Sequence, residues 1–146
     1  MKISVGSDHH GFHMKEQVKA HLTALGHEVA DHGCYSTDEI DYPDVAVEVA
    51  RSVVDHEAER AVLVCGTGIG MAIAACKTPG IRAAAVSDPY SAERASASNN
   101  AQVLCLGAKV VGPEVATILV DHWLAAEFDS NRSGRKVAKL DALDAR

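Results

Sequence analysis

The chain has 146 residues, and its 47% hydrophobic content suffices for one sizeable core but not for two ordinary domains. A formal net charge of −6 disfavours nucleic-acid binding, which needs Lys and Arg dominating one face. No apolar run approaches the roughly 20 residues of a membrane helix, and the first residues carry no signal-peptide pattern. We therefore expect a cytoplasmic protein with neither a nucleic-acid nor a membrane partner.

Apolar runs alternate with helical patterns along the chain, which predicts five strands that are each followed by a helix. The expected strands cover residues 3–5, 27–30, 61–64, 82–86 and 103–106. The expected helices cover residues 12–25, 45–54, 69–76, 91–96 and 115–124, with a short last helix after a loop at 130–134. This alternation predicts an α/β fold, a three-layer sandwich with helices on both faces of a five-stranded parallel sheet.

Ligands of such sheets bind beyond the carboxyl ends of the strands, so the functional site is expected in the segments that follow the strands. These segments are residues 7–11, 32–42, 65–70, 87–90 and 107–112.

The most informative of them is Cys65–Gly70, with the sequence C-G-T-G-I-G. Its glycines let the backbone turn sharply and expose amide N–H groups at the start of the following helix. Those amides and the helix dipole attract negative charge and favour the thiolate form of Cys65. We therefore expect a base and an anion-binding turn in one loop.

A nucleotide-binding loop is the alternative interpretation of these glycines. The dinucleotide pattern G-x-G-x-x-G belongs after the first strand, whereas here G-x-G-x-G follows the third. No Lys-Ser or Lys-Thr follows the glycines, as a Walker loop requires. Both differences disfavour a nucleotide-binding module.

The four cysteines are too widely spaced for a zinc site or a C-x-x-C redox motif. They are Cys34, Cys65, Cys76 and Cys105. We expect Cys76 and Cys105 to be buried as small hydrophobic side chains, because their neighbours in the sequence are apolar.

Further polar candidates flank the predicted strands and helices. Asp8 and His9 end the first strand, where they can hydrogen-bond or bind an anion. His9 and His13 could instead share a metal ion, but no third ligand is evident and no metal site is expected. Asp41 either caps the helix that follows it or contacts substrate. The pair Asn99-Asn100 either ends a helix in a left-handed turn or contacts a sugar hydroxyl.

A basic cluster stands near the C-terminus of this acidic chain. Its members are Arg132, Arg135, Lys136 and Lys139. They form either a solvated helix face or a phosphate-binding group that reaches a cleft, on this subunit or on a neighbouring one.

Seven motifs, in order over nearly the whole chain, resemble the ribose-5-phosphate isomerase B family, which includes the galactose-6-phosphate isomerase subunits. They are G-S-D-H-H-G-F at 6–12, D-Y-P at 41–43, C-G-T-G-I-G at 65–70, G-I-R-A at 80–83, P-Y-S-A at 89–92, N-N-A-Q at 99–102 and V-V-G at 110–112. The resemblance implies a flavodoxin-like or Rossmann-like fold and a cofactor-free aldose–ketose isomerase of phosphorylated sugars that works through a cis-enediolate. It also implies a homodimer or homotetramer with shared active sites. We expect one domain over residues 1–146, whose C-terminal helix, at about 133–146, packs on a partner subunit.

The resemblance further implies roles for single residues. Cys65 would move the proton between C1 and C2 with help from Thr67. The enediolate oxygens would be held by the backbone of Gly66, Gly68, Ile69 and Gly70. The implied sugar contacts are Asp8, Tyr42 and Asn99, and the implied phosphate contacts are His9, Arg132 and Lys136. Lys109 is a further substrate-binding candidate, and Lys109 and Lys136 both stand where the family usually has arginine. A non-catalytic subunit of a hetero-oligomer would lack the base at Cys65.

Ser98 departs from the pentose-specific relatives, in which a histidine at this position opens the furanose ring. Serine does not titrate near neutral pH and is a poor acid or base for that step. A tetrose 4-phosphate cannot form a furanose, because its phosphate occupies the ring-closing hydroxyl. Ser98, kept among the catalytic candidates, therefore predicts an open-chain substrate such as erythrulose 4-phosphate or erythrose 4-phosphate. Residues 91–102 also resemble erythrulose-4-phosphate isomerases, whereas the segment around Asp8 resembles pentose enzymes, and ribose 5-phosphate with ribulose 5-phosphate is the alternative.

Overall fold

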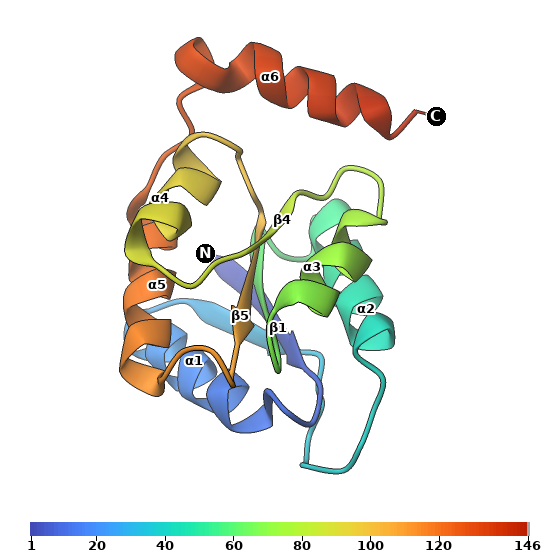
Figure 1. Cartoon of the computed structure of the whole chain (residues 1–146), viewed down its shortest axis with the longest axis vertical. Coiled ribbons are helices and arrows are strands. Elements are labelled where there is room, and N and C mark those ends of the chain that lie inside the picture. Colours follow the sequence, from blue (N-terminus) through green and yellow to red (C-terminus); the bar gives the residue numbers. More distant parts are fainter. Residues whose placement is uncertain (146) are drawn as a thin grey trace.

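Every apolar run that was expected to be a strand lies in one parallel sheet of the computed structural model, which describes residues 1–145. The strands are β1 Lys2–Ser7, β2 Glu28–Asp31, β3 Arg60–Cys65, β4 Ala83–Ala85 and β5 Val103–Gly107. The helices are α1 Phe12–Ala24, α2 Tyr42–Val54, α3 Ile69–Cys76, α4 Pro89–Ala97, α5 Pro113–Ala125 and α6 Ser130–Leu143. Helices α1, α4 and α5 cover one face of the sheet and α2 and α3 cover the other (Figure 1). The predicted three-layer α/β sandwich is confirmed.

The strand order is β2-β1-β3-β5-β4. It differs from the flavodoxin order 2-1-3-4-5 in the exchange of the last two strands. In this order β5 is buried at every position, whereas β4 has only three residues and none of them is buried. The short strand β4 therefore occupies the edge of the sheet.

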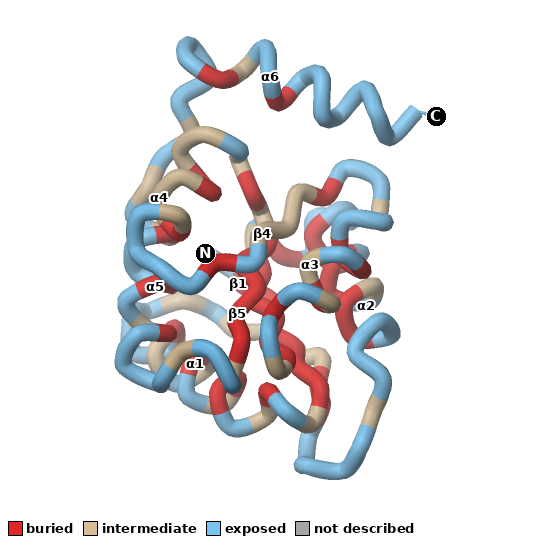
Figure 2. Tube along the Cα trace, in the orientation of Figure 1, coloured by how far each residue is buried: buried red, intermediate tan, exposed pale blue. Residues whose placement is uncertain are grey.

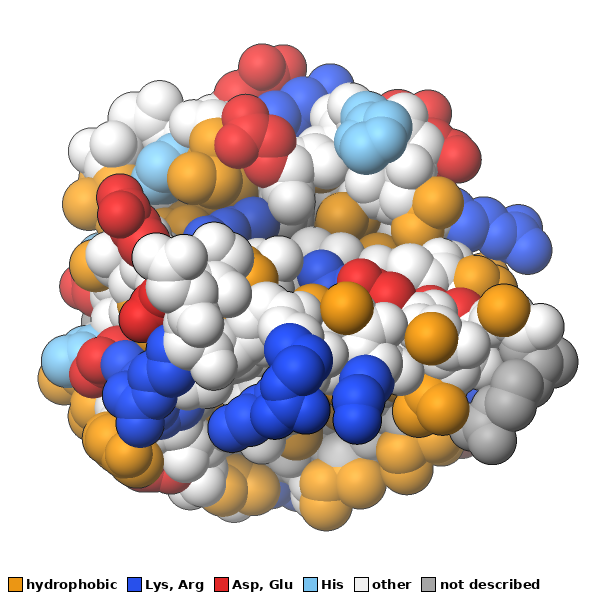
Figure 3. All heavy atoms as spheres, turned by 90° about the horizontal axis from the view of Figure 1, so that it is seen from above, with side chains coloured by type: hydrophobic (Ala, Val, Ile, Leu, Met, Phe, Trp, Pro, Cys, Tyr) orange, Lys and Arg blue, Asp and Glu red, His pale blue; other side chains and the backbone are white. Residues whose placement is uncertain are grey.

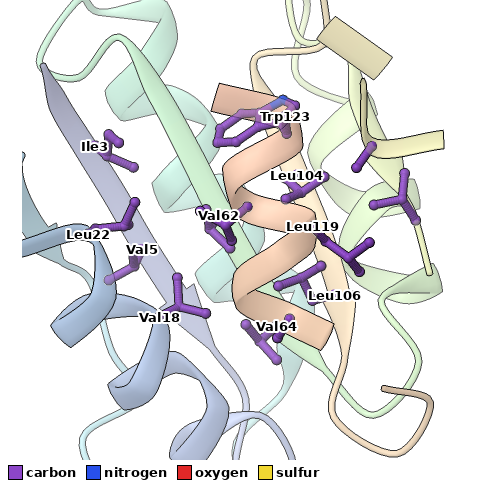
Figure 4. Packing of buried hydrophobic residues seen from close by; sticks show 14 of the residues in the cluster. Ile3, Val5, Val18, Leu22, Val62, Val64, Leu104, Leu106, Leu119 and Trp123 are labelled. Atoms are coloured by element: carbon purple, nitrogen blue, oxygen red, sulfur yellow. The ribbon is translucent and has the colours of Figure 1, made fainter. Parts of the chain in front are cut away.

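Side chains of β3 alternate between two cores, since successive residues of a strand point to opposite faces. Val62 and Val64 pack in the core beneath α1 and α5, which also contains the fully buried Trp123 of α5 (Figure 4). Leu63 and Cys65 pack in the core beneath α2 and α3. Burial on both faces explains the continuous apolar sequence of this central strand.

Local signals in the sequence place several helix ends. Pro43 and Pro113 lie in the first turns of α2 and α5, where the missing N–H of proline costs nothing. Gly26 follows α1 with a φ of 91°. Asn100 follows α4 with a φ of 49°, so the left-handed alternative for this pair of asparagines is realised at its second residue.

The last helix begins earlier than predicted. Residues 130–134, which were expected to form a loop, are the start of α6. The cause is Asp129, whose carboxylate accepts hydrogen bonds from the N–H groups of Asn131 at 3.1 Å and Arg132 at 3.2 Å. Such a cap satisfies amides that have no partner inside the helix, and it is worth about 1 kcal/mol.

Helix α6 lies beyond the end of the sheet, apart from the rest of the sandwich, and most of its residues are exposed (Figures 1 and 2). It reaches Leu143, whereas Arg146, the last residue of the predicted helix, lies outside the described residues. No helix within residues 1–145 combines the length and the apolar character that crossing a membrane requires.

Candidate active site

The carboxyl ends of β1 and β3 meet at one edge of the sheet, where α1 departs toward one face and α3 toward the other (Figure 1). Such a reversal opens a crevice, and a cavity of about 600 Å³ lies at this point. The predicted site residues that line it are Asp8, His9, Tyr42, Cys65, Gly66, Thr67, Ile69, Gly70 and Lys109. Four segments that are distant in sequence therefore converge on one cavity.

Cys65 is the last residue of β3 and lines the cavity. Its side chain is 5% exposed and belongs to the core beneath α2 and α3. The backbone N–H of Gly68 donates a hydrogen bond to the Sγ of Cys65 at 3.1 Å. This hydrogen bond fixes the sulfur against the glycine turn that begins α3.

Gly68 holds the sulfur and does not itself line the cavity. It is buried, and its φ of 79° is a left-handed conformation that glycine adopts without strain. A Cβ at this position would also lie 3.1 Å from the carbonyl carbon of Leu106 in β5. The residue was predicted to contact the enediolate, whereas its amide points to Cys65.

Thr67 and Ile69 form the exposed part of the turn, and Gly70 is partly buried. The Oγ1 of Thr67 accepts a hydrogen bond from the N–H of Ile69 at 3.2 Å. Gly70 lies in the first turn of α3, where N–H groups have no acceptor within the helix. The N-terminus of α3 therefore presents backbone N–H groups and the positive end of the helix dipole to the cavity.

Tyr42, the first residue of α2, packs directly against the glycine turn. A Cβ on Gly70 would lie 2.6 Å from atoms of the Tyr42 ring, so this contact requires glycine. Asp41 occupies the N-cap position of α2, but its side chain makes no capping hydrogen bond and lines the cavity instead. Asp41 therefore does not cap α2, and it lies where it can contact a substrate.

The loop after β1 is fixed by its own hydrogen bonds. The Oδ1 of Asp8 accepts the N–H groups of His10 at 3.0 Å and Gly11 at 3.1 Å, and Asp8 is buried. The Nδ1 of His9 accepts the N–H of Ile40 at 3.3 Å. The second contact ties this loop to the segment that leads into α2.

Lys109, in the loop after β5, brings a positive charge to the cavity. Its backbone N–H donates to the carbonyl oxygen of Gly66 at 3.0 Å, and its aliphatic stem passes over Gly66. The ammonium group therefore lies in the loop after β5, beside the turn that follows Cys65. With His9, it supplies donors for an anion in the cavity.

Apart from Asp41, for which two roles were considered, four cavity residues were not among the predicted site residues. They are His10, Glu39, Ile40 and Ile73. The pair of histidines that follows Asp8 in the sequence was a signal for His10. Glu39 and Ile40 belong to residues 32–42, one of the segments in which the functional site was expected. Within residues 1–145 no group of three or more His, Cys, Asp and Glu side chains is arranged to hold a metal ion.

The remaining predicted site residues lie beyond the amino ends of the strands, at the opposite end of the sheet from the cavity. They are Ser98, Asn99, Arg132 and Lys136, from the end of α4 and from α6, which Figure 1 shows far from the loops after β1 and β3. Asn99 lines a second cavity, of about 610 Å³, between α6 and β4. A single chain therefore does not bring the two groups of predicted residues together.

Seen from the α6 side, the molecule carries Lys and Arg side chains along its face (Figure 3). On α6 itself the exposed basic residues are Arg132, Arg135, Lys136 and Lys139. The far end of α6 is tied to the sandwich by an ion pair between Arg82 and Asp141, with an N–O distance of 2.6 Å.

One of the two cysteine expectations is wrong. Cys105 is fully buried as predicted, and burial raises the pKa of its thiol well above the usual value. Cys76 is exposed, because it is the last residue of α3 and faces the cavity beneath α6. An apolar sequence context does not bury a residue that lies on the outer side of its helix.

The fold and this site define an α/β enzyme with a thiol and a helix N-terminus at the carboxyl edge of its sheet. The chain belongs to the Ribose/Galactose Isomerase family, whose model matches residues 3–140, and it is an isomerase of that family. The resemblance seen in the sequence motifs is thereby confirmed.

Similar proteins of this family include a ribose-5-phosphate isomerase B and an erythrulose-4-phosphate isomerase. The chain is 43% identical to ribose-5-phosphate isomerase B of Escherichia coli K12, over 99% of this chain and 97% of that protein. It is 47% identical to D-erythrulose-4-phosphate isomerase 2 of Mycolicibacterium smegmatis, again over 99% and 97% of the two chains. The solved structure of Clostridium thermocellum ribose-5-phosphate isomerase B superposes with a TM-score of 0.98 at 41% identity, covering 99% of this chain and 98% of that one.

Proposed function

We propose that this isomerase interconverts an aldose phosphate and a ketose phosphate through a cis-enediolate, without a cofactor, and that Cys65 is the base. The observation that carries the proposal is the position of Cys65 on the cavity wall, where its sulfur accepts the Gly68 N–H at 3.1 Å. A thiolate held in this way is a base next to a site for a developing oxyanion.

In the proposed reaction the Cys65 thiolate removes the proton from C2 of the open-chain aldose. The C2–H electron pair forms the C1–C2 double bond, and negative charge moves to the carbonyl oxygen. The thiol then returns the proton to C1, the proton of the C2 hydroxyl moves to the C1 oxygen, and the ketose results. Thr67 assists the sulfur, while the backbone of Gly66, Ile69 and Gly70 holds the enediolate oxygens.

Substrate binding in this proposal uses both walls of the cavity. Asp8 and Tyr42 contact sugar hydroxyls, and His9 and Lys109 contact the anionic end of the substrate. Lys109 is a point charge in place of the bidentate fork of arginine, so it attracts a phosphate without fixing its orientation.

We further propose that a second copy of the chain completes each active site. Asn99, Arg132 and Lys136 of the partner would contact the substrate there, and Ser98 of the partner would lie near its carbonyl end. The support for this step is the separation of the two groups of residues at opposite ends of the sheet, together with the exposed basic face of α6. A phosphate needs about two or more charge-assisted donors, and Arg132 and Lys136 would supply them.

The proposed substrate is an open-chain sugar phosphate, with erythrulose 4-phosphate and erythrose 4-phosphate as the pair to test first. Ser98 has no group that titrates near neutral pH, so it does not serve ring opening. The 47% identity to an erythrulose-4-phosphate isomerase supports this choice. The second candidate is the pair ribose 5-phosphate and ribulose 5-phosphate, which the 43% identity to a ribose-5-phosphate isomerase B favours.

The test compares kcat/KM for tetrose, pentose and hexose phosphates and follows the exchange of a substrate C–H proton in deuterated water. We expect turnover with exchange, and a preference for the tetrose. A clear preference for ribulose 5-phosphate contradicts the tetrose assignment, and turnover of none of the sugar phosphates contradicts the proposed reaction.

Shared sites are tested by mixing two inactive variants, Cys65→Ala and Arg132→Gln, after dissociation and reassembly. In a two-fold symmetric dimer, half of the molecules pair unlike chains and hold one intact site, so about a quarter of the wild-type activity is expected to return. Sites built within single chains would give no recovery.

A further inference from the structure

Arg94 and Ser98 lie one helical turn apart at the end of α4, so their side chains share one face of the helix. The Nη1 of Arg94 donates a hydrogen bond to the Oγ of Ser98 at 3.2 Å. Its Nη2 donates to Glu93 Oε1 at 2.7 Å, within an ion pair in which the Arg94 side chain is 30% exposed. The guanidinium is therefore held in place behind the serine hydroxyl.

The third nitrogen of this guanidinium is unused within the described chain. The Nε of Arg94 is buried and has no hydrogen-bond partner among residues 1–145. Buried polar atoms in folded proteins nearly always have one, so an unpartnered N–H here requires an explanation. Arg94 also lines the cavity that contains Asn99, which places it at the predicted half-site.

The contact between Arg94 and Ser98 leaves the serine hydroxyl as a hydrogen-bond donor. Arginine stays charged at every working pH and never accepts a hydrogen bond. Because it occupies one acceptor position on the oxygen of Ser98, the hydroxyl proton is left to donate to another group. A donor backed by positive charge suits a carbonyl or enediolate oxygen, whereas opening a ring requires a group that also takes up a proton.

We propose that Arg94 determines the substrate specificity of this isomerase by orienting the Ser98 hydroxyl as a donor to the carbonyl oxygen of an open-chain sugar phosphate. The inference rests on the proposed function, in which Ser98 enters the active site of the partner subunit. Arg94 acts through Ser98 as a positioning residue, and the pair selects against substrates that must first open a furanose ring.

The test measures kcat/KM for erythrulose 4-phosphate and ribulose 5-phosphate in Arg94→Met, in Ser98→Ala and in the double variant. Arg94→Met keeps most of the aliphatic stem and removes every donor. We expect each single variant to lower the tetrose-to-pentose ratio of kcat/KM about tenfold or more, the effect of losing a hydrogen bond to a charged group. The double variant is expected to match the single ones, because the two residues act as a unit.

The matched control is Arg51→Met, which removes the basic residue from the last turn of α2, as Arg94→Met does in α4. Arg51 is exposed and lines neither the cavity at Cys65 nor the cavity at Asn99, so the ratio of this variant is expected to stay at the wild-type value. The specificity ratio separates the proposed role from a structural one, since a loss of folded protein lowers both rates equally.

Two results overturn the inference, and they are distinguishable. If the wild type prefers the tetrose and Arg94→Met keeps the wild-type ratio, Arg94 does not set specificity and the proposed function stands. If the wild type prefers ribulose 5-phosphate, the proposed substrate fails before any variant is measured, and the inference fails with it.

Discussion

The sulfur of Cys65 and the backbone N–H of Gly68 are joined by a hydrogen bond of 3.1 Å, which makes the turn after β3 a support for the sulfur as well as the start of a helix. Gly68 is at once the N-cap of α3, a left-handed residue and the donor to the thiol. One residue thus links the direction of α3 to the chemistry of the cavity, so a substitution of Gly68 is expected to lower both activity and stability.

Replacing Cys65 with Ala is expected to lower kcat by about 10²- to 10⁴-fold, the range that a positioned general base contributes. The fold should persist, because removing one sulfur atom leaves a small void beneath α2 and α3. Steady-state kinetics and circular dichroism check both expectations. Cys76→Ala is the matched control, and a Cys65→Ala enzyme within a few-fold of the wild type would mean that another group is the base.

The sequence was sufficient to predict the strands and the cavity. Each strand is a short apolar run between breakers, and in a parallel sheet the carboxyl ends of the strands share one edge. Asp8, Tyr42, Cys65 and Lys109 could therefore be assigned to one cavity although they are distant in the chain. Their predicted chemical roles stay predictions.

Other features depend on tertiary contacts that periodicity does not encode. The sequence pattern contains nothing that exchanges β4 and β5, since this choice follows from the packing of the whole sheet. Lys15 resembles any helical lysine in the sequence, yet it is fully buried, with its Nζ 2.8 Å from the carboxylate of Asp31 and 2.7 Å from the carbonyl oxygen of Cys34. The exposure of Cys76 likewise depends on where α3 packs.

Gly70→Ala is expected to weaken substrate binding, because the new Cβ would lie 2.6 Å from the Tyr42 ring and must displace it. We expect KM to rise about tenfold, since a displaced contact residue costs about 1 to 2 kcal/mol of binding free energy. The control is Gly112→Ala, whose Cβ meets nothing closer than a Glu114 oxygen at 3.9 Å. An unchanged KM in Gly70→Ala would place Tyr42 outside the substrate contacts.

Thiol alkylation should distinguish the cysteines. Iodoacetamide reacts with accessible thiolates, so Cys76 is expected to be labelled first in the native protein. Cys105 should stay unlabelled until the protein unfolds, because it is fully buried and burial raises the pKa of its thiol. Mass spectrometry of digests taken over time gives the order of labelling, and early labelling of Cys105 would contradict the packing of β5.

Asp31→Asn is expected to lower the free energy of unfolding at pH 7 by about 2 to 3 kcal/mol, since hydrogen bonds to charged groups are lost while Glu16, 3.2 Å from the Lys15 Nζ, still faces the ammonium. Burial opposes ionisation of Asp31, but hydrogen bonds from Lys15, Lys19 and the N–H of Gly33 outweigh it and hold the pKa of the carboxyl below its ordinary value of 3.8. Urea unfolding of the wild type and the variant measures the difference.

The ion pair between Asp31 and Lys15 also determines how the difference in stability between the wild type and Asp31→Asn changes with pH. Since the pKa of Asp31 is lower in the folded chain than in the unfolded one, its stabilisation is complete above about pH 4 and is lost as the pH falls through the folded value. The wild type should therefore approach Asp31→Asn in stability at low pH. Glu28→Gln removes the exposed pair of Lys2 and Glu28, 4.0 Å apart, and should change stability by less than about 1 kcal/mol. A gap between wild type and Asp31→Asn that stayed constant from pH 7 to pH 2 would show that the ionised carboxylate is not what stabilises buried Lys15.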